Sequence, residues 1–172
     1  MIHLHSSLQH KFIIVATNFF TKWVEAKPLK EASGATIHQF IFRNIICRFG
    51  IPEVLVSDRG AAFMGGDVEK LVNDYGIQFV HSTPYYAQSN GQAEASNKII
   101  ITLLKKLLVE NPHQWHETLY ETLWAYRTSK RNLTTTTPEA LMFGHDAVLP
   151  LEVNVQSLRI QDQNHLISED YV

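Results

Sequence analysis

The hydrophobic positions near the start of the chain come as one short continuous run, which is typical of a buried β-strand. Residues 11–20 form an apolar run rich in β-branched side chains, which predicts a buried strand. Residues 21–29 place Trp23 and Val24 among charged side chains and predict a second strand that is more exposed. Because residues 18–21 leave room only for a tight connection, we expect the two strands to pair antiparallel.

A helical period replaces the strand pattern between residues 33 and 49. Ser33 is a suitable N-cap for this helix, and Gly50 and Pro52 are expected to end it. The apolar side chains that recur at helical spacing should form its buried face, and they are Ile37, Phe40, Ile41, Ile45 and Phe49.

Two short strands come next in the predicted order. Residues 53–57 form an apolar strand that ends at Asp58, and residues 77–82 form another. A loop rich in glycine and a short helix over residues 67–75, closed by Gly76, should lie between them. A polar loop then leads to the helical half of the chain.

The second half of the pattern predicts two long helices and a short one. The first should begin near Gly91 and end before Pro112, and the second should cover residues 113–128. Thr137 as the cap and Gly144 as the closing residue frame the short helix. The apolar stripes of the long helices are Ile100, Leu103, Leu104, Leu107 and Leu108, and Trp115, Leu119, Leu123, Trp124 and Tyr126.

Strands that precede and then alternate with helices predict an α/β fold with a mixed sheet covered by helices. The chain has 172 residues, 45% hydrophobic and 19% charged, which suits one folded domain. We expect this domain to span residues 11–153, with residues 1–10 as a loose segment or a remnant strand and residues 154–172 as a loose tail. No apolar run approaches the length of a membrane span.

The net charge of −2 means that a nucleic acid would have to be held by local positive patches. The single cysteine, Cys47, cannot form an internal disulfide, which fits an intracellular location.

Two carboxylates stand out by their positions in the predicted elements. Asp58 ends a buried strand, and Glu94 lies in the predicted first turn of the long helix after a polar loop. Such a pair suits Mg²⁺, which binds one or two carboxylates together with water and substrate phosphate. The simpler alternative is that Asp58 caps a loop and Glu94 only complements the helix dipole.

The surroundings of both residues resemble the catalytic core of retroviral and retrotransposon integrases. Between Asp58 and Glu94 lie 35 residues, an interval similar to that between the second and third acidic residues of this family. The matching segments are VLVSDRGAAF around Asp58, HSTPYYAQSNGQAEASN before and around Glu94, KFIIVATNFFTKWVEAKPL upstream and LWAYRTSKRNLTTTTPEALMFGHDAVLPLEV downstream. The downstream segment is similar to gypsy-type long-terminal-repeat elements of plants.

The resemblance implies an RNase H-like fold and metal-dependent polynucleotidyl transfer that joins the element's DNA ends to target DNA. Asp58 and Glu94 would then be catalytic residues and ligands of Mg²⁺ or Mn²⁺. It also implies DNA as the partner, a possible homo-oligomer, and a nuclear location for a functional protein.

The family's first carboxylate lies on a central strand that would stand upstream of Met1, so the resemblance also predicts an N-terminally truncated, catalytically incomplete core with a weakened metal site. Asn18 is not a substitute for that carboxylate, because it begins the turn after a strand. Two alternatives stay open: a non-catalytic remnant that binds nucleic acid or self-associates, and an RNase H-like nuclease.

Residues around Glu94 are candidates for contact with nucleic acid. Amide side chains can donate to phosphates or base edges, a lysine can neutralise a phosphate, and tyrosines can stack on unpaired bases. A helix cap and a solvated helix face are the corresponding simpler interpretations. The candidates are Asn90, Gln92, Asn97, Lys98, Tyr85 and Tyr86.

Overall fold

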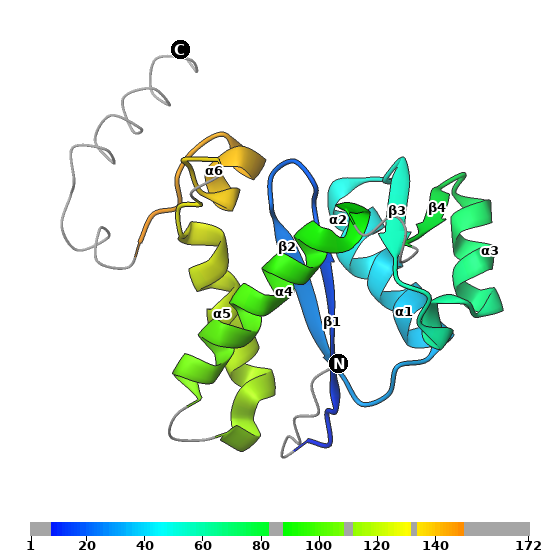
Figure 1. Cartoon of the computed structure of the whole chain (residues 1–172), viewed down its shortest axis with the longest axis horizontal. Helices are drawn as coiled ribbons and strands as arrows, with labels where there is room; N and C mark the ends of the chain where they lie inside the picture. The colour runs from blue at the N-terminus through cyan, green and yellow to red at the C-terminus, as the bar shows by residue number, and fades with distance from the viewer. Residues whose placement is uncertain (1–7, 83–87, 109–111, 132–133, 150–172) are drawn as a thin grey trace, which may run out of the picture.

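The computed structural model describes residues 8–82, 88–108, 112–131 and 134–149. The described strands form two ladders of two strands each. β1 (Phe12–Thr17) pairs antiparallel with β2 (Val24–Leu29), and β3 (Val54–Ser57) pairs parallel with β4 (Gln78–His81). The sheet region is therefore mixed in direction, as the sequence predicted, and Figure 1 shows the two ladders beside each other.

The turn between β1 and β2 is as tight as predicted. Oδ1 of Asn18 accepts hydrogen bonds from the backbone amides of Phe20 and Thr21, at 3.0 and 2.9 Å. Lys22 completes the reversal in the left-handed region, with φ of 59°. Asn18 is thus a turn residue whose side chain replaces backbone hydrogen bonds.

The predicted burial of the first two strands was wrong. β2 has four buried residues, whereas Ile14 is the only buried residue of β1. The charge of Glu25 suggested exposure, but its carboxylate is paired with arginines and lies inside the protein. Helix α5 (Trp115–Thr128) also packs against β2, which removes that strand from solvent.

The predicted helix after Ser33 is present with one irregularity. Ser33 and Thr36 form a reciprocal capping box at the start of α1 (Gly34–Phe40). The helix then widens into a π-helical segment, η1 (Ile41–Ile46), before α2 (Cys47–Phe49). The simple period of 3.6 residues did not predict this widening. Gly50 ends the segment with φ of 89°, as expected for a glycine stop.

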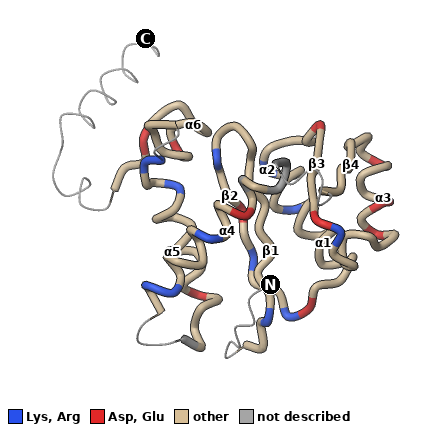
Figure 2. Tube along the Cα trace, viewed as in Figure 1, with Lys and Arg blue, Asp and Glu red and all other residues tan. Residues whose placement is uncertain are grey.

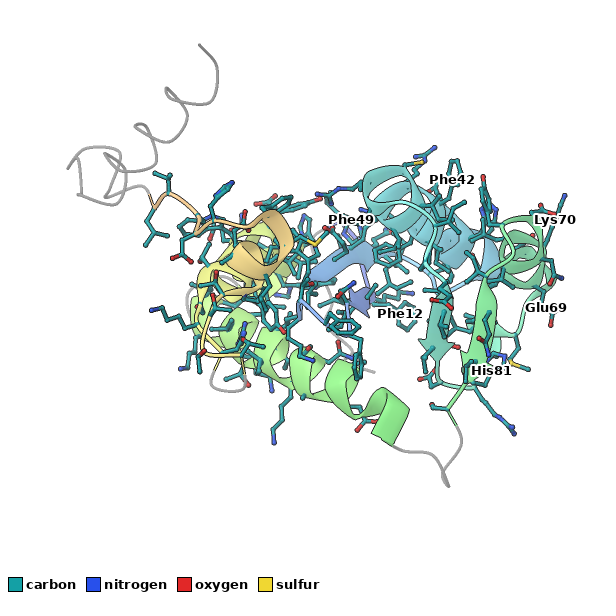
Figure 3. All side chains as sticks on the ribbon, turned by 90° about the horizontal axis from the view of Figure 1, so that it is seen from above. Phe12, Phe42, Phe49, Glu69, Lys70 and His81 are labelled. Carbon is teal, nitrogen blue, oxygen red and sulfur yellow. The ribbon has the colours of Figure 1, made fainter. Side chains whose placement is uncertain are left out.

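The core lies on both faces of the β1–β2 ladder, because alternate residues of a strand point to opposite sides. On one face, Ile14 and Leu29 pack with α1 and with α3 (Gly66–Asp74), which follows η2 (Ala61–Phe63). On the other face, Val24 and Ala26 pack with α4 (Gln88–Leu107) and α5. Figure 3 shows the two helical layers from above.

The apolar stripes of the long helices are confirmed with two exceptions. Ile100, Leu104 and Trp115 are among their fully enclosed side chains. Leu107 is 50% exposed and Trp124 is 45% exposed, so neither belongs to the core. Near the second helix, η4 (Pro112–Gln114) precedes α5, and α6 (Pro138–Phe143) has the predicted cap and closing glycine.

The start of α5 packs against the segment before β1 through three aromatic rings. The His10 ring lies 6.1 Å from that of Trp115 and 5.1 Å from that of His116. His116 is buried, and neither of its ring nitrogens has a hydrogen-bond partner among the described residues. Burial lowers the pKa of His10 from its usual 6.5, and His116 and Lys30 lower it further.

This lowered pKa predicts a loss of stability in acid. The folded state binds fewer protons at His10 than the unfolded chain, so stability should fall as the pH drops from 6.5 towards the lower folded value. We expect His10→Gln to flatten this part of the stability curve. Urea denaturation between neutral pH and pH 5 measures it, and an unchanged slope in the variant would exclude His10 as the cause.

Within the described residues, none of the helices has the length and apolar character that a membrane crossing requires.

Candidate metal centre and nucleic-acid surface

Asp58 lies exposed at the carboxyl end of β3, where the strand enters a loop. Its Oδ1 accepts a hydrogen bond from the backbone amide of Gly60 at 3.1 Å, so one carboxylate oxygen is oriented by the loop. The residue therefore does cap a loop, as the simpler interpretation held. The hydrogen bond uses one oxygen, and the other can still bind a cation.

The neighbouring strand adds a histidine beside this residue. In the parallel register, Ser57 lies opposite His81, the last residue of β4. Oγ of the buried Ser57 donates to the carbonyl of Asp58 at 3.0 Å and lies 3.3 Å from Nδ1 of His81. With the serine proton directed at that carbonyl, Nδ1–H of His81 is the donor to Oγ, and Nε2 is left as an acceptor. The sequence analysis assigned no role to either residue, although both end adjacent strands.

Glu94 is exposed on α4, but it does not lie in the first turn of that helix. The helix begins at Gln88, three residues before the predicted start, which places Glu94 in the second turn. Its backbone amide is therefore inside the helical hydrogen-bond ladder, away from the free amides that an acidic residue complements. The helix-dipole interpretation of Glu94 is wrong for this reason.

The structure brings the two carboxylate-bearing elements together. α4 packs against both β1 and β3. The helix that carries Glu94 is therefore in contact with the strand that leads to Asp58.

The carboxylates of Asp58 and Glu94 could provide some, but not all, of the ligands of a hard divalent cation. Asp58 and Glu94 offer carboxylate oxygens, which Mg²⁺ prefers, and both are accessible to solvent. Among the residues that the structure describes, no three His, Cys, Asp or Glu side chains group as a metal site. Two carboxylates fit Mg²⁺ that keeps water and phosphate as its other ligands.

The structure describes the side chains of two of the candidate nucleic-acid-binding residues, Asn97 and Lys98. Lys98 is exposed on α4, one turn after Glu94. The carboxamide oxygen of Asn97 is buried and has no hydrogen-bond partner in the described part of the chain. Asn90 and Gln92 belong to α4, but their side chains lie outside the described residues, as do Tyr85 and Tyr86 entirely.

Charge is dispersed over the molecule, as Figure 2 shows. Lysines and arginines lie on both halves of the molecule, and so do acidic residues. On α4, Lys98 is followed by Lys105 and Lys106 near the far end. This distribution agrees with the net charge of −2 and confines any DNA contact to local patches.

The loop glycine beside Asp58 gives a direct test of how this carboxylate is held. A Cβ at Gly60 would lie 3.0 Å from Oδ1 of Asp58, closer than ordinary contact distance. We expect Gly60→Ala to shift the carboxylate and weaken Mn²⁺ binding about tenfold, as loss of an orienting contact does. Gly66→Ala is the matched control, because nothing lies within 4 Å of its Cβ position. Equal Mn²⁺ affinities in the two variants would show that Gly60 has no such role.

The chain is similar in sequence to segments of retroviral polyproteins. No family model matches the chain. The Pro-Pol polyprotein of Simian foamy virus type 1 is 34% identical over 155 residues, covering 90% of this chain and 13% of that polyprotein. The Gag-Pol polyprotein of Koala retrovirus is 38% identical over 101 residues, covering 59% of the chain and 6% of the polyprotein. The chain thus spans a small part of the curated relatives it matches.

Solved structures give the fold. The HTLV-2 integrase catalytic core domain in complex with magnesium is 22% identical, with a TM-score of 0.65, and the match covers 82% of this chain and 91% of that one. A chain of the simian T-cell lymphotropic virus intasome in complex with PP2A regulatory subunit B56 gamma has a TM-score of 0.68 at 24% identity, over 80% of this chain and 49% of that one. The fold is therefore RNase H-like. The chain therefore has the fold of retroviral integrase catalytic cores and is similar in sequence to a segment of retroviral Pol polyproteins. A gypsy-type, plant-like subtype stays a prediction.

Proposed function

We propose that the chain acts in DNA integration, as a metal-dependent polynucleotidyl transferase core with Asp58 and Glu94 as its metal ligands. One observation carries the proposal. In an integrase-core fold, the exposed Asp58 ends the strand against which the Glu94 helix packs. The element's DNA ends and the target DNA are the proposed substrates, and a functional protein would meet chromosomal DNA in the nucleus.

In this proposal, Asp58 and Glu94 bind the metal ion and Lys98 binds a DNA phosphate. Mg²⁺ or Mn²⁺, when bound, would activate the attacking oxygen and stabilise the leaving one. Asp58 would hold the ion from a loop that the Gly60 amide keeps in place, and Glu94 would hold it from the rigid α4. Lys98, one helical turn beyond Glu94, is placed to neutralise a DNA phosphate beside the ion.

The test is a strand-joining assay on branched DNA, with Mg²⁺ or Mn²⁺ and with EDTA as the metal-free control. Joined products that depend on the metal support the transferase. Products that are only hydrolysed support the RNase H-like nuclease, because water then replaces a DNA hydroxyl as the attacking group. The same DNA, labelled with fluorescein, gives its affinity for the protein by anisotropy.

A second candidate function is DNA binding or self-association without catalysis. It is favoured by the absence, within the described residues, of any group of three His, Cys, Asp or Glu side chains that could hold a metal ion. Tyr120 and Trp124, on one face of α5, are 65% and 45% exposed and suit a contact between protein chains. Metal-independent DNA binding without joined or cleaved products would support this alternative, and sedimentation would report self-association.

A further inference from the structure

Two polar side chains at the end of the β3–β4 ladder, Ser57 and His81, take no direct part in the proposed metal binding. They lie opposite each other in the parallel register, and Figure 3 labels His81 at the end of β4. The backbone amide of Ser82 donates to the Ser57 carbonyl at 2.8 Å, so the ladder continues to the last residue of β3. Both side chains therefore belong to a hydrogen-bonded strand pair that stops directly before Asp58.

A chain of hydrogen bonds leads from His81 to Asp58. Nδ1 of His81 lies 3.3 Å from Oγ of Ser57, and that Oγ lies 3.0 Å from the backbone carbonyl oxygen of Asp58. A serine hydroxyl has one proton, so a hydroxyl that donates to the carbonyl must accept from the imidazole. The ring proton of His81 on Nδ1 gives each link one donor and one acceptor.

Burial and packing keep this chain of hydrogen bonds in place. Ser57 is 8% exposed and His81 is partly buried, so water does not freely replace either partner. Leaving a buried polar group unpaired is costly, which favours the hydrogen-bonded arrangement. The His81 ring also packs edge-on against Phe79, with ring centroids 4.6 Å apart, and this contact holds the imidazole beside the serine.

Asp58 is held at two points. The Ser57 hydroxyl holds its backbone carbonyl, and the Gly60 amide holds its carboxylate at 3.1 Å. The residue is exposed and begins a loop, where the backbone is less constrained than within a strand. A ligand that is oriented before the ion arrives binds more tightly, because its ordering does not oppose binding. Ser57 and His81 supply this ordering at the backbone, as Gly60 does at the carboxylate.

We propose that His81 is a positioning residue for metal binding and acts through Ser57 on the backbone of Asp58. The inference rests on the proposed function, in which Asp58 is a metal ligand. The imidazole fixes the Ser57 hydroxyl, the hydroxyl fixes the Asp58 carbonyl, and the carboxylate is thereby oriented for Mg²⁺ or Mn²⁺. Groups that orient a ligand without touching the ion contribute about ten- to a hundredfold to metal affinity.

The experiment measures the Mn²⁺ affinity of the full chain by water-proton relaxation. His81→Phe keeps a ring against Phe79 but removes the donor, and it should weaken Mn²⁺ binding about tenfold. His81→Asn returns an N–H group close to the place of Nδ1 and should regain most of the affinity. Ser57→Ala should cause the same loss as His81→Phe. The double variant should lose little more, because both changes break one chain of hydrogen bonds.

A matched control and a metal-free measurement accompany the affinities. His38 on α1 also stacks on a phenylalanine ring, that of Phe42, so His38→Phe makes the same change elsewhere and should leave Mn²⁺ affinity unchanged. Thermal unfolding verifies that each variant is folded. The NMR shift of the Asp58 carbonyl carbon reports its hydrogen bond without metal, and it should move in His81→Phe and return in His81→Asn.

The outcomes separate this inference from the proposed function. Either an unchanged Mn²⁺ affinity or an unchanged Asp58 carbonyl shift in His81→Phe would overturn the inference alone. A loss that His81→Asn does not restore would also overturn it, because the shape of the ring would then explain the loss. No Mn²⁺ binding by the parent chain would instead overturn the proposed function, and with it the role of His81.

Discussion

Replacing Glu94 by glutamine is expected to weaken Mn²⁺ binding by at least about a hundredfold and to abolish metal-dependent strand joining. Outer-shell partners of a metal already contribute about ten- to a hundredfold to affinity, and a direct ligand contributes no less. The substitution keeps the size and helical position of the side chain while removing its charge. Mn²⁺ binding, followed by water-proton relaxation, measures the loss even if joining is slow.

The matched control for this variant is Glu69→Gln, an exposed carboxylate on α3. It should change neither Mn²⁺ affinity nor DNA joining. Asp58→Asn should reproduce the loss seen in Glu94→Gln, since both carboxylates belong to one proposed site. Mn²⁺ binding that survives both changes would exclude the pair as ligands and leave the non-catalytic function as the better account.

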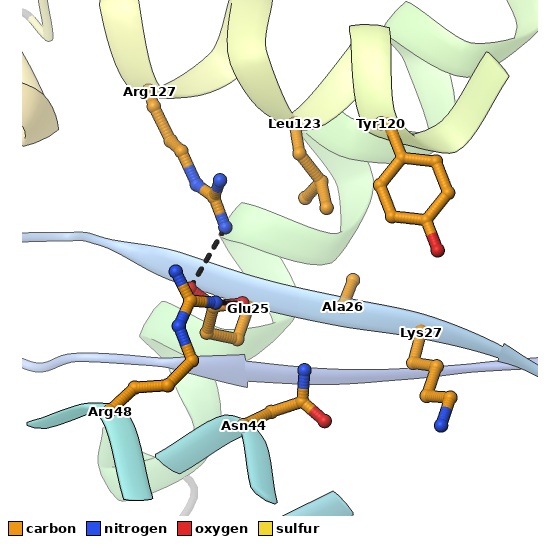
Figure 4. Close-up of a pocket in the computed structure, with 8 residues that line it drawn as sticks. All are labelled: Glu25, Ala26, Lys27, Asn44, Arg48, Tyr120, Leu123 and Arg127. Carbon is orange, nitrogen blue, oxygen red and sulfur yellow. Dashed lines mark ion pairs between the residues drawn. The ribbon is translucent and has the colours of Figure 1, made fainter. Parts of the chain in front are cut away.

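Glu25→Ala is expected to lower the free energy of unfolding by about 3 kcal/mol, at the low end for removal of one partner from a buried ion pair. The carboxylate is 5% exposed, and the guanidinium of Arg127 beside it is 18% exposed (Figure 4). Burial lowers the pKa of Arg127 and Arg48 lowers it further, while Glu25 raises it. Without Glu25, the two arginines would therefore repel each other with no anion between them. Urea denaturation gives the change in free energy.

Two controls separate the lost charge from other effects. Glu69→Ala should change the stability by less than about 0.5 kcal/mol, because it removes an exposed side chain. The double variant Glu25→Met with Arg127→Met should recover part of the loss, since it leaves no buried charge. Recovery stays incomplete because Arg127 also donates to the Val24 carbonyl at 2.7 and 3.0 Å. A Glu25→Ala variant as stable as the Glu69→Ala control would refute the argument.

Local sequence chemistry was sufficient to predict much of the fold. The turn at Asn18, the cap at Ser33, the glycine stops and the cap at Thr137 depend on the conformations and hydrogen bonds of a few adjacent residues. Such features form wherever those residues occur together, so they can be found without knowledge of distant contacts. Asp58 was placed at the end of a strand in the same way, whereas the predicted first-turn position of Glu94 was wrong because α4 begins earlier.

Tertiary structure decided the features that depend on distant neighbours. The burial of Glu25 requires Arg127, which lies 102 residues further along the chain, and Arg48 from a different helix. The contact between Ser57 and His81 requires the parallel register of β3 and β4. The sequence does not show which distant residues these side chains contact. The charge of Glu25 therefore led to the wrong prediction that its strand is exposed.

The sequence by itself determined the order and type of the main elements, the two candidate metal ligands and the resemblance to integrase cores. Only the tertiary structure decided that α4 begins early enough to place Glu94 in its second turn, that β2 is more buried than β1, and that cations gather around a saturated carboxylate. The physical reason is one of range. Backbone propensity and capping act over a few residues, whereas burial and charge pairing depend on which segments pack together.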